Sequence, residues 1–174
     1  MQLRKMYQAR PQQTLALIPD GAAGIRETLK VMRDWAVDGS RDQSVREKAV
    51  SIIAYIPKNA WVRQAQSLWS WVKQNIRYVR DPFGTEQLHF AATVLSQGYG
   101  DCDDQSILMA ALLLSVGIPA RLVAVATNEP GVFEHVYAEA YLGNQWVAME
   151  TTEEKPWGWK PPGILSAYIT PVKG

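Results

Sequence analysis

The chain has 174 residues, of which 47% are hydrophobic and 20% charged, and its formal net charge is +1. This length fits one compact domain with a substantial core, and the composition is typical of a folded globular protein rather than a disordered one. No long basic run is present, so a nucleic-acid partner is not expected.

Nothing in the sequence predicts export or membrane insertion. The N-terminus lacks an apolar segment of signal-peptide length, and no stretch reaches the roughly 18 apolar residues of a membrane span. We therefore expect a cytoplasmic protein, or one carried in a particle assembled in the cytoplasm, with no membrane partner.

Apolar residues recur at helical spacing in the N-terminal half of the chain. Helices are predicted over residues 24–37, 44–56, 61–79 and 87–95. The first is expected to end at Gly39–Ser40, the second before Pro57, and the third at Asp81–Pro82. Residues 1–20, with two prolines, are predicted to be an extended lead-in.

The C-terminal half is predicted to contain one buried helix followed by strands. The helix after Asp101 is apolar nearly all round from Ile107 to Leu114, which is typical of a central helix. Strands are predicted over residues 121–126, 134–142, 145–150 and 164–169. Gly143–Asn144 is a two-residue hairpin turn between two of them. The order predicts an α+β domain in which N-terminal helices and a central helix pack on a small antiparallel β-sheet.

Cys102 is the single cysteine, and it opens the predicted central helix. Asp101 is the expected N-cap, and Asp104 is expected to complete a capping-box-like arrangement. Unpaired N–H groups at this helix end favour a thiolate or an oxyanion, whereas the carboxylates of Asp101, Asp103 and Asp104 oppose ionisation. A reactive thiol and a buried structural cysteine therefore both fit. The glycines of Gly98–Gly100 favour the reactive alternative, because they permit close approach to the helix tip.

The Gly143–Asn144 turn fixes the register of the hairpin and so places a possible base. It makes His135 and Glu150 diagonal neighbours on one face, about 7–8 Å apart, whereas Glu139 lies about 13 Å away along the strand. A carboxylate holding one imidazole nitrogen leaves the other nitrogen to serve a nucleophile. An ordinary half-buried strand histidine is the alternative. His89 is expected to be a packing or surface residue.

These residues lie in two segments, GYGDCDDQSILMAALLLSVGIPARLVAV and EHVYAEAYLGNQWVAMETT. Together they resemble the core of the transglutaminase-like cysteine enzymes, which have a papain-like catalytic core. The resemblance covers about residues 78–159 and implies that Cys102 is the nucleophile, His135 the base and Glu150 the third member of a triad. Glu150 departs from the family pattern, which has an aspartate there.

The resemblance implies cysteine-dependent acyl transfer on a peptide or carboxamide, with no cofactor or metal. Hydrolysis is favoured over protein crosslinking, because a small domain has little surface with which to exclude water. We expect one domain over 1–174, with a helical part over 1–80 and a catalytic core over 81–174. A non-catalytic scaffold or peptide-binding domain is the main alternative. The segment PDGAAGIRETLKVMRDW resembles phage and prophage proteins, which implies a phage-type member and a role in assembly.

The sequence offers only candidates for the other parts of the site, namely a second oxyanion donor and the cleft wall. Tyr78 and Gln87 are candidates for a second oxyanion donor, beside the backbone N–H of Cys102. Trp146, Trp157 and Trp159 are candidates for a cleft wall beside His135, although each could equally belong to the core.

Overall fold

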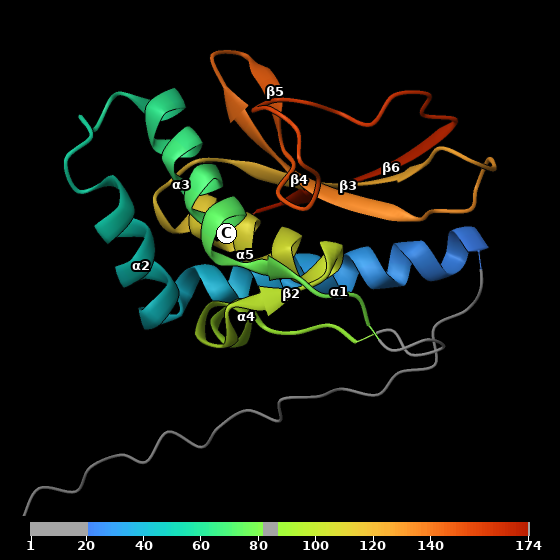
Figure 1. Cartoon of the computed structure of the whole chain (residues 1–174), viewed down its shortest axis with the longest axis horizontal. Coiled ribbons are helices and arrows are strands. Elements are labelled where there is room, and N and C mark those ends of the chain that lie inside the picture. Colours follow the sequence, from blue (N-terminus) through green and yellow to red (C-terminus); the bar gives the residue numbers. More distant parts are fainter. Residues whose placement is uncertain (1–20, 82–86, 174) are drawn as a thin grey trace, which may run out of the picture.

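A computed structural model describes residues 21–81 and 87–173 (Figure 1). The predicted lead-in over 1–20 lies outside the described residues. The helices are α1 (Gly21–Arg41), α2 (Gln43–Ile53), α3 (Trp61–Asn75), α4 (Ala91–Gln97) and α5 (Cys102–Ser115). The longer strands are β3 (Ala120–Ala126), β4 (His135–Leu142), β5 (Gln145–Met149) and β6 (Ser166–Val172). The predicted α+β class is confirmed.

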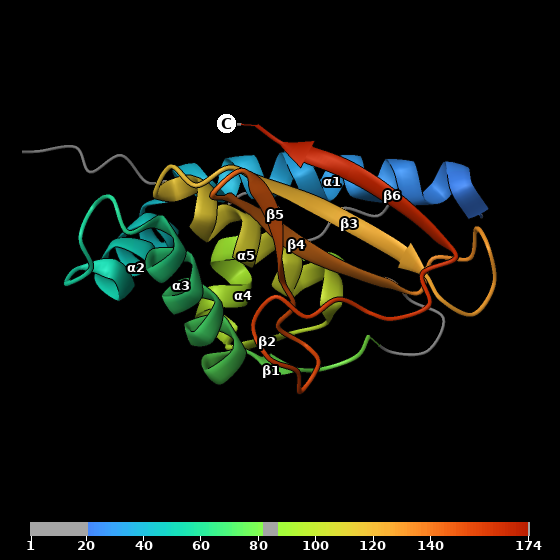
Figure 2. The same cartoon turned by 90° about the horizontal axis from the view of Figure 1, so that it is seen from above.

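The four longer strands form one antiparallel sheet in the order β5-β4-β3-β6. Helices α1 and α5 lie on one face of this sheet, and α2 and α3 lie toward one end of it (Figures 1 and 2). The predicted hairpin register is confirmed, with Leu142 opposite Gln145. Positive φ at Gly143 and Asn144 is the geometry of the two-residue turn that sets this register.

Helix α5 is the centre of the core, as its apolar sequence predicts. Ile107, Leu108, Met109, Leu112 and Leu113 are fully buried. The helix packs against α1 and against β3 and β4, so its first residue, Cys102, is held beside the start of β4. Within the described ranges, 21–81 and 87–173, no helix combines the length and the apolar character needed to cross a membrane.

Several helix boundaries differ from the prediction; α2, for example, ends at Ile53 instead of at residue 56. Helix α1 continues through Gly39 to Arg41. Gly39 lies where α1 meets α4, and a Cβ there would come within 2.7 Å of the Ala91 Cβ, so this glycine permits close packing instead of ending the helix. Helix α3 ends at Asn75, and the chain then becomes extended at Ile76. Residues 77–78 form a short parallel pair with residues 99–100, labelled β1 and β2, which the apolar spacing did not predict.

The short helix predicted over 87–95 is displaced, since α4 begins at Ala91. The backbone N–H groups of Gln87 and His89 bond to the side chains of Asp81 and Asp104 instead of entering a helix. The final strand, predicted over 164–169, lies two residues later as β6. These shifts leave the positions of the candidate site residues unchanged.

Candidate active site

Cys102 is the first residue of α5 and is partly buried. Asp101 caps the helix, because its Oδ1 accepts hydrogen bonds from the backbone N–H groups of Asp103 at 3.1 Å and Asp104 at 3.2 Å. The backbone N–H of Cys102 has no partner among the residues that the structure describes. It is therefore available to a ligand oxygen next to the thiol.

Asp104 does not complete a capping box, contrary to expectation. Its carboxylate accepts a hydrogen bond from the backbone N–H of His89 at 2.7 Å and contacts His89 Nδ1 at 2.9 Å. The description of His89 as a packing or surface residue is therefore incomplete, because this side chain pairs with a buried carboxylate. Gly100 lies tightly against the same aspartate: a Cβ at Gly100 would be 2.6 Å from the Asp104 Cβ.

His135 begins β4, and its Nε2 lies 2.5 Å from Oε2 of Glu150. This confirms the contact predicted from the hairpin register. Glu139 makes other contacts, as expected from its distance, and pairs with Arg121 and Lys160 on the same face of the sheet. The imidazole of His135 thus has one nitrogen committed to a carboxylate and a second nitrogen, Nδ1, for another partner.

Glu150 is nearly fully buried and well held, although it lies one residue beyond β5. Its Oε1 accepts hydrogen bonds from the Thr152 backbone N–H at 2.7 Å and from Thr152 Oγ1 at 2.8 Å. Burial alone would raise the pKa of Glu150. The hydrogen bond to His135, the charge of His135 and the hydrogen bonds from Thr152 have a larger effect in the opposite direction, so the pKa is lowered. The side chain is therefore a carboxylate that can orient and stabilise an imidazolium.

Cys102 and His135 line one cavity of about 310 Å³, a volume within the range of small-ligand sites. Its other walls come from α1, from the chain after β1 and from the approach to β4. They are Ile25, Thr28, Met32, Tyr78, Arg80, Asp81, Asp101, Asp103, Phe133, Glu134 and Val136. The contribution of α1 was not predicted, because the apolar spacing of Ile25 and Met32 identifies a core face without separating core from cleft.

The surroundings of Cys102 favour the neutral thiol over the thiolate. Burial raises its pKa above the usual range, and the nearby charges of Asp103 and Asp101 raise it further, while a backbone hydrogen bond from Val136 opposes these effects. Cys102 Sγ lies 3.7 Å from Oδ1 of Asp103. Of the three carboxylates predicted to oppose ionisation of the thiol, Asp103 and Asp101 do so, whereas Asp104 is paired with His89.

The carboxyl of Asp101 is itself perturbed. Burial, followed by the charges of Asp104 and Asp81, raises its pKa to about 6 although its N-cap hydrogen bonds act in the other direction. The helix tip consequently gains negative charge as the pH rises from mildly acidic to neutral.

The predicted walls are only partly correct. Tyr78 lines the cavity, but Gln87 does not, and the backbone N–H of Gln87 already bonds to Asp81. None of the three tryptophans lines the cavity: Trp146 contacts Tyr141 and Arg121, Trp157 packs against Trp69, and Trp159 lies beneath Lys155. Tyr78 and Phe133 are the aromatic walls instead.

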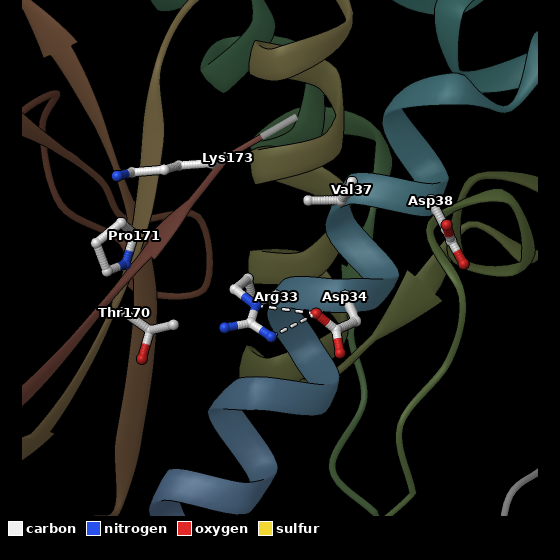
Figure 3. Close-up of a pocket in the computed structure, with 7 residues that line it drawn as sticks. All are labelled: Arg33, Asp34, Val37, Asp38, Thr170, Pro171 and Lys173. Atoms are coloured by element: carbon white, nitrogen blue, oxygen red, sulfur yellow. Dashed lines mark hydrogen bonds and ion pairs between the residues drawn. The ribbon is translucent and has the colours of Figure 1, made fainter.

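A second hollow, of about 580 Å³, lies between α1 and the end of β6 (Figure 3). Its lining contains no cysteine or histidine, and Arg33 there is bonded to Asp34 at 2.7 Å. The described residues also contain no group of three or more side chains of the types that bind metals in an arrangement able to hold an ion. The catalytic roles of Cys102, His135 and Glu150 stay predictions.

Two solved structures share this fold. A putative protease from Parabacteroides distasonis aligns with a TM-score of 0.59 and 14% identity, over 74% of this chain and 26% of that chain. A putative cysteine protease from Cytophaga hutchinsonii aligns with a TM-score of 0.55 and 21% identity, over 73% of this chain and 46% of that chain. The chain thus spans less than half the length of either protein.

Comparison with curated proteins gives no match. A family model, that of the transglutaminase-like superfamily, matches residues 46–151, which is more than half of the chain and includes all three candidate site residues. The chain therefore belongs to the transglutaminase-like superfamily.

Proposed function

We propose that this protein is a cysteine-dependent acyl-transfer enzyme that hydrolyses a peptide or carboxamide bond. The observation that carries the proposal is the 2.5 Å contact between His135 and Glu150, made by a histidine that lines the same cavity as Cys102. Superfamily membership and the shared fold of two putative proteases support it.

The raised thiol pKa favours one version of the mechanism. His135 Nδ1 takes the Cys102 proton as Sγ attacks the substrate carbonyl, so the thiolate forms only during the reaction. The new S–C bond gives a tetrahedral oxyanion, which the backbone N–H of Cys102 stabilises. Glu150 stabilises the imidazolium formed at this stage.

Collapse of the oxyanion breaks the C–N bond, and the imidazolium gives its proton to the departing amine or ammonia. Water then attacks the thioester, with His135 again as base, and releases the carboxylic acid and the thiol. An amine in place of water would give a crosslinked product. Hydrolysis is the simpler outcome, because water needs no binding site for a second substrate beside the cavity of Cys102.

The test is hydrolysis of a mixed peptide-amide library, followed by mass spectrometry, with purified wild-type protein. We expect cleavage that is lost in Cys102→Ala and His135→Ala. His89→Asn is the matched control, since His89 also pairs with a buried carboxylate and is similarly exposed, at 20% against 18%. Adding a primary amine distinguishes the two products, because a crosslinking enzyme would incorporate it.

A second candidate is a non-catalytic scaffold or peptide-binding domain on the same fold. The raised pKa of Cys102 favours it, because a thiol kept neutral by burial and by Asp103 and Asp101 is typical of an inert cysteine. This candidate predicts that Cys102→Ala and His135→Ala leave every function of the protein unchanged. Binding of a peptide without cleavage would support it.

A further inference from the structure

Helix α3 is bonded to the segment that carries the third triad residue. The indole Nε1 of Trp69 donates a hydrogen bond of 2.5 Å to the backbone carbonyl of Glu150, a residue 81 positions away in the sequence. One turn later, Lys73 Nζ donates to the backbone carbonyl of Glu153 and lies 3.8 Å from the carboxylate of Glu154.

These bonds act where the sheet no longer controls the backbone. Strand β5 ends at Met149, so neither Glu150 nor the residues after it are fixed by a strand ladder. The carboxylate of Glu150 nevertheless has to stay within 2.5 Å of His135 Nε2. Local bonds from Thr152 hold the carboxylate, but they come from the same segment and would move with it.

Packing strengthens the attachment. Trp69 and Trp157 form an edge-to-face pair with ring centroids 5.6 Å apart, so the indole is held on one side by a residue from the same C-terminal segment. The Lys73 ammonium lies 6.0 Å from the centroid of the Trp69 ring. We call Trp69 and Lys73 together the α3 clamp.

We propose that the α3 clamp is a positioning device for the proposed triad, in which Trp69 sets the place of the Glu150 backbone and so keeps the Glu150 carboxylate against His135. The inference rests on the proposed function. Trp69 and Lys73 are positioning residues, because neither lines the cavity of Cys102 and their side-chain hydrogen bonds, ion pair and ring contacts are with the segment 150–157 and with each other.

The variant Trp69→Phe removes the N–H donor and keeps an aromatic ring. Trp71→Phe is the matched control: Trp71 lies two residues along the same helix, is also partly buried, and contacts Lys48 rather than the Glu150 segment. Lys73→Met is a second variant that keeps the aliphatic stem. Thermal unfolding of each variant shows whether it is folded at the assay temperature.

Two readouts follow, and one does not need a substrate. Proton NMR of the wild type should show a downfield, slowly exchanging resonance from the imidazole N–H of His135, which is identified by its absence in His135→Ala. We expect this resonance to be broadened or lost in Trp69→Phe and retained in Trp71→Phe. For peptide hydrolysis, Trp69→Phe should lower kcat about tenfold with KM little changed, as expected when a catalytic group is displaced rather than removed. Lys73→Met should change both readouts in the same direction, by less.

The clamp is refuted if folded Trp69→Phe matches Trp71→Phe in both the His135 resonance and kcat. If wild-type protein hydrolyses no peptide, the proposed function fails, and the NMR comparison alone still decides whether Trp69 positions Glu150. A Trp69→Phe variant with a normal resonance and a raised KM would also contradict the proposal, since it would place Trp69 in substrate binding.

Discussion

The carboxylate of Glu150 reaches Nε2 of His135 across 2.5 Å from a position one residue beyond the end of its strand. The side chain is 2% exposed, and its second oxygen accepts two hydrogen bonds from Thr152. A buried carboxylate with this many donors is an orienting group, so its length and charge should both matter to the reaction of Cys102.

Shortening the Glu150 side chain should therefore lower the rate of peptide hydrolysis, and removing its carboxylate should lower the rate further. We expect Glu150→Ala to lower kcat/KM for peptide hydrolysis by about 100-fold or more, because the imidazolium loses its partner. Glu150→Asp should lose about tenfold, since the shorter side chain must move to keep the contact. Steady-state kinetics measure both effects. Equal activity of Glu150→Asp and wild type would show that the length of this residue is not critical.

Glu150→Ala should also lower the free energy of unfolding. Glu150→Ala leaves the Thr152 donors and the His135 ring without their buried acceptor, at a cost of about 1–3 kcal/mol. Because folding lowers the pKa of Glu150, its contribution is present above the unfolded-state pKa and is lost as the pH falls through the folded value. Urea unfolding at neutral and at acidic pH should show that the difference in the free energy of unfolding between wild type and Glu150→Ala becomes smaller in acid.

Asp101 should have the opposite pH dependence. Its pKa rises from 3.8 to about 6 on folding, so the folded state holds the proton more tightly and stability falls as the pH rises between these values. Asp101→Asn keeps an N-cap side chain and removes the charge. We expect the variant to gain roughly 1–3 kcal/mol over wild type at pH 7.5 and no advantage near pH 4. Urea unfolding at both pH values measures it, and a gap independent of pH would contradict the prediction.

Neutralising Asp103 should make the thiol more reactive. The charge of Asp103 raises the pKa of Cys102, and its Oδ1 lies 3.7 Å from Sγ. Asp103→Asn should therefore shift the pH dependence of Cys102 alkylation by iodoacetamide to lower pH. Glu47→Gln, on an exposed face of α2, is the control and should leave the profile unchanged. Alkylation is followed by intact mass, and identical profiles for Asp103→Asn and wild type would show that the charge of Asp103 does not raise the pKa of Cys102.

Adding a methyl group at Gly100 should disturb the packing of β2 against Asp104 in the first turn of α5. A Cβ there would lie 2.6 Å from the Asp104 Cβ, in a region where Asp104 also holds His89. We expect Gly100→Ala to cost about 1–3 kcal/mol, as overpacking does in well-packed interiors. The free energy of unfolding from urea titration tests this, and a change near zero would mean that the backbone of β2 can move aside.

Local patterns were enough to predict the central helix, the hairpin and its register. The all-round apolar sequence after Cys102 gave the buried helix, and the Gly143–Asn144 turn paired His135 with Glu150, because alternation along a strand fixes which side chains share a face. These parts depend on residues close together in the sequence, where one turn or one period decides the geometry.

Contacts between distant segments could not be predicted in this way. Nothing periodic connects Trp69 to Glu150, and the bond of Asp104 to His89 depends on the course of the chain between α3 and α4. Residue type left the three C-terminal tryptophans open between cleft wall and core, and the path of the segment after β5 carries Trp157 against Trp69 of α3, away from the cavity. Tertiary position, rather than residue type, selected Tyr78 and Phe133 as the cleft walls.

The most direct test is whether Cys102 becomes acylated in a reaction that needs His135. Purified protein is mixed with p-nitrophenyl acetate, quenched in acid, and mapped by peptide mass spectrometry in wild type, His135→Ala and His89→Asn. We predict an acetyl group on Cys102 in wild type and in His89→Asn, and little or none in folded His135→Ala. A wild type whose Cys102 stays unmodified and that releases p-nitrophenol no faster than Cys102→Ala would contradict the assignment of nucleophile and base and favour the scaffold. The same labelling rate of Cys102 in His135→Ala as in wild type would contradict it as well.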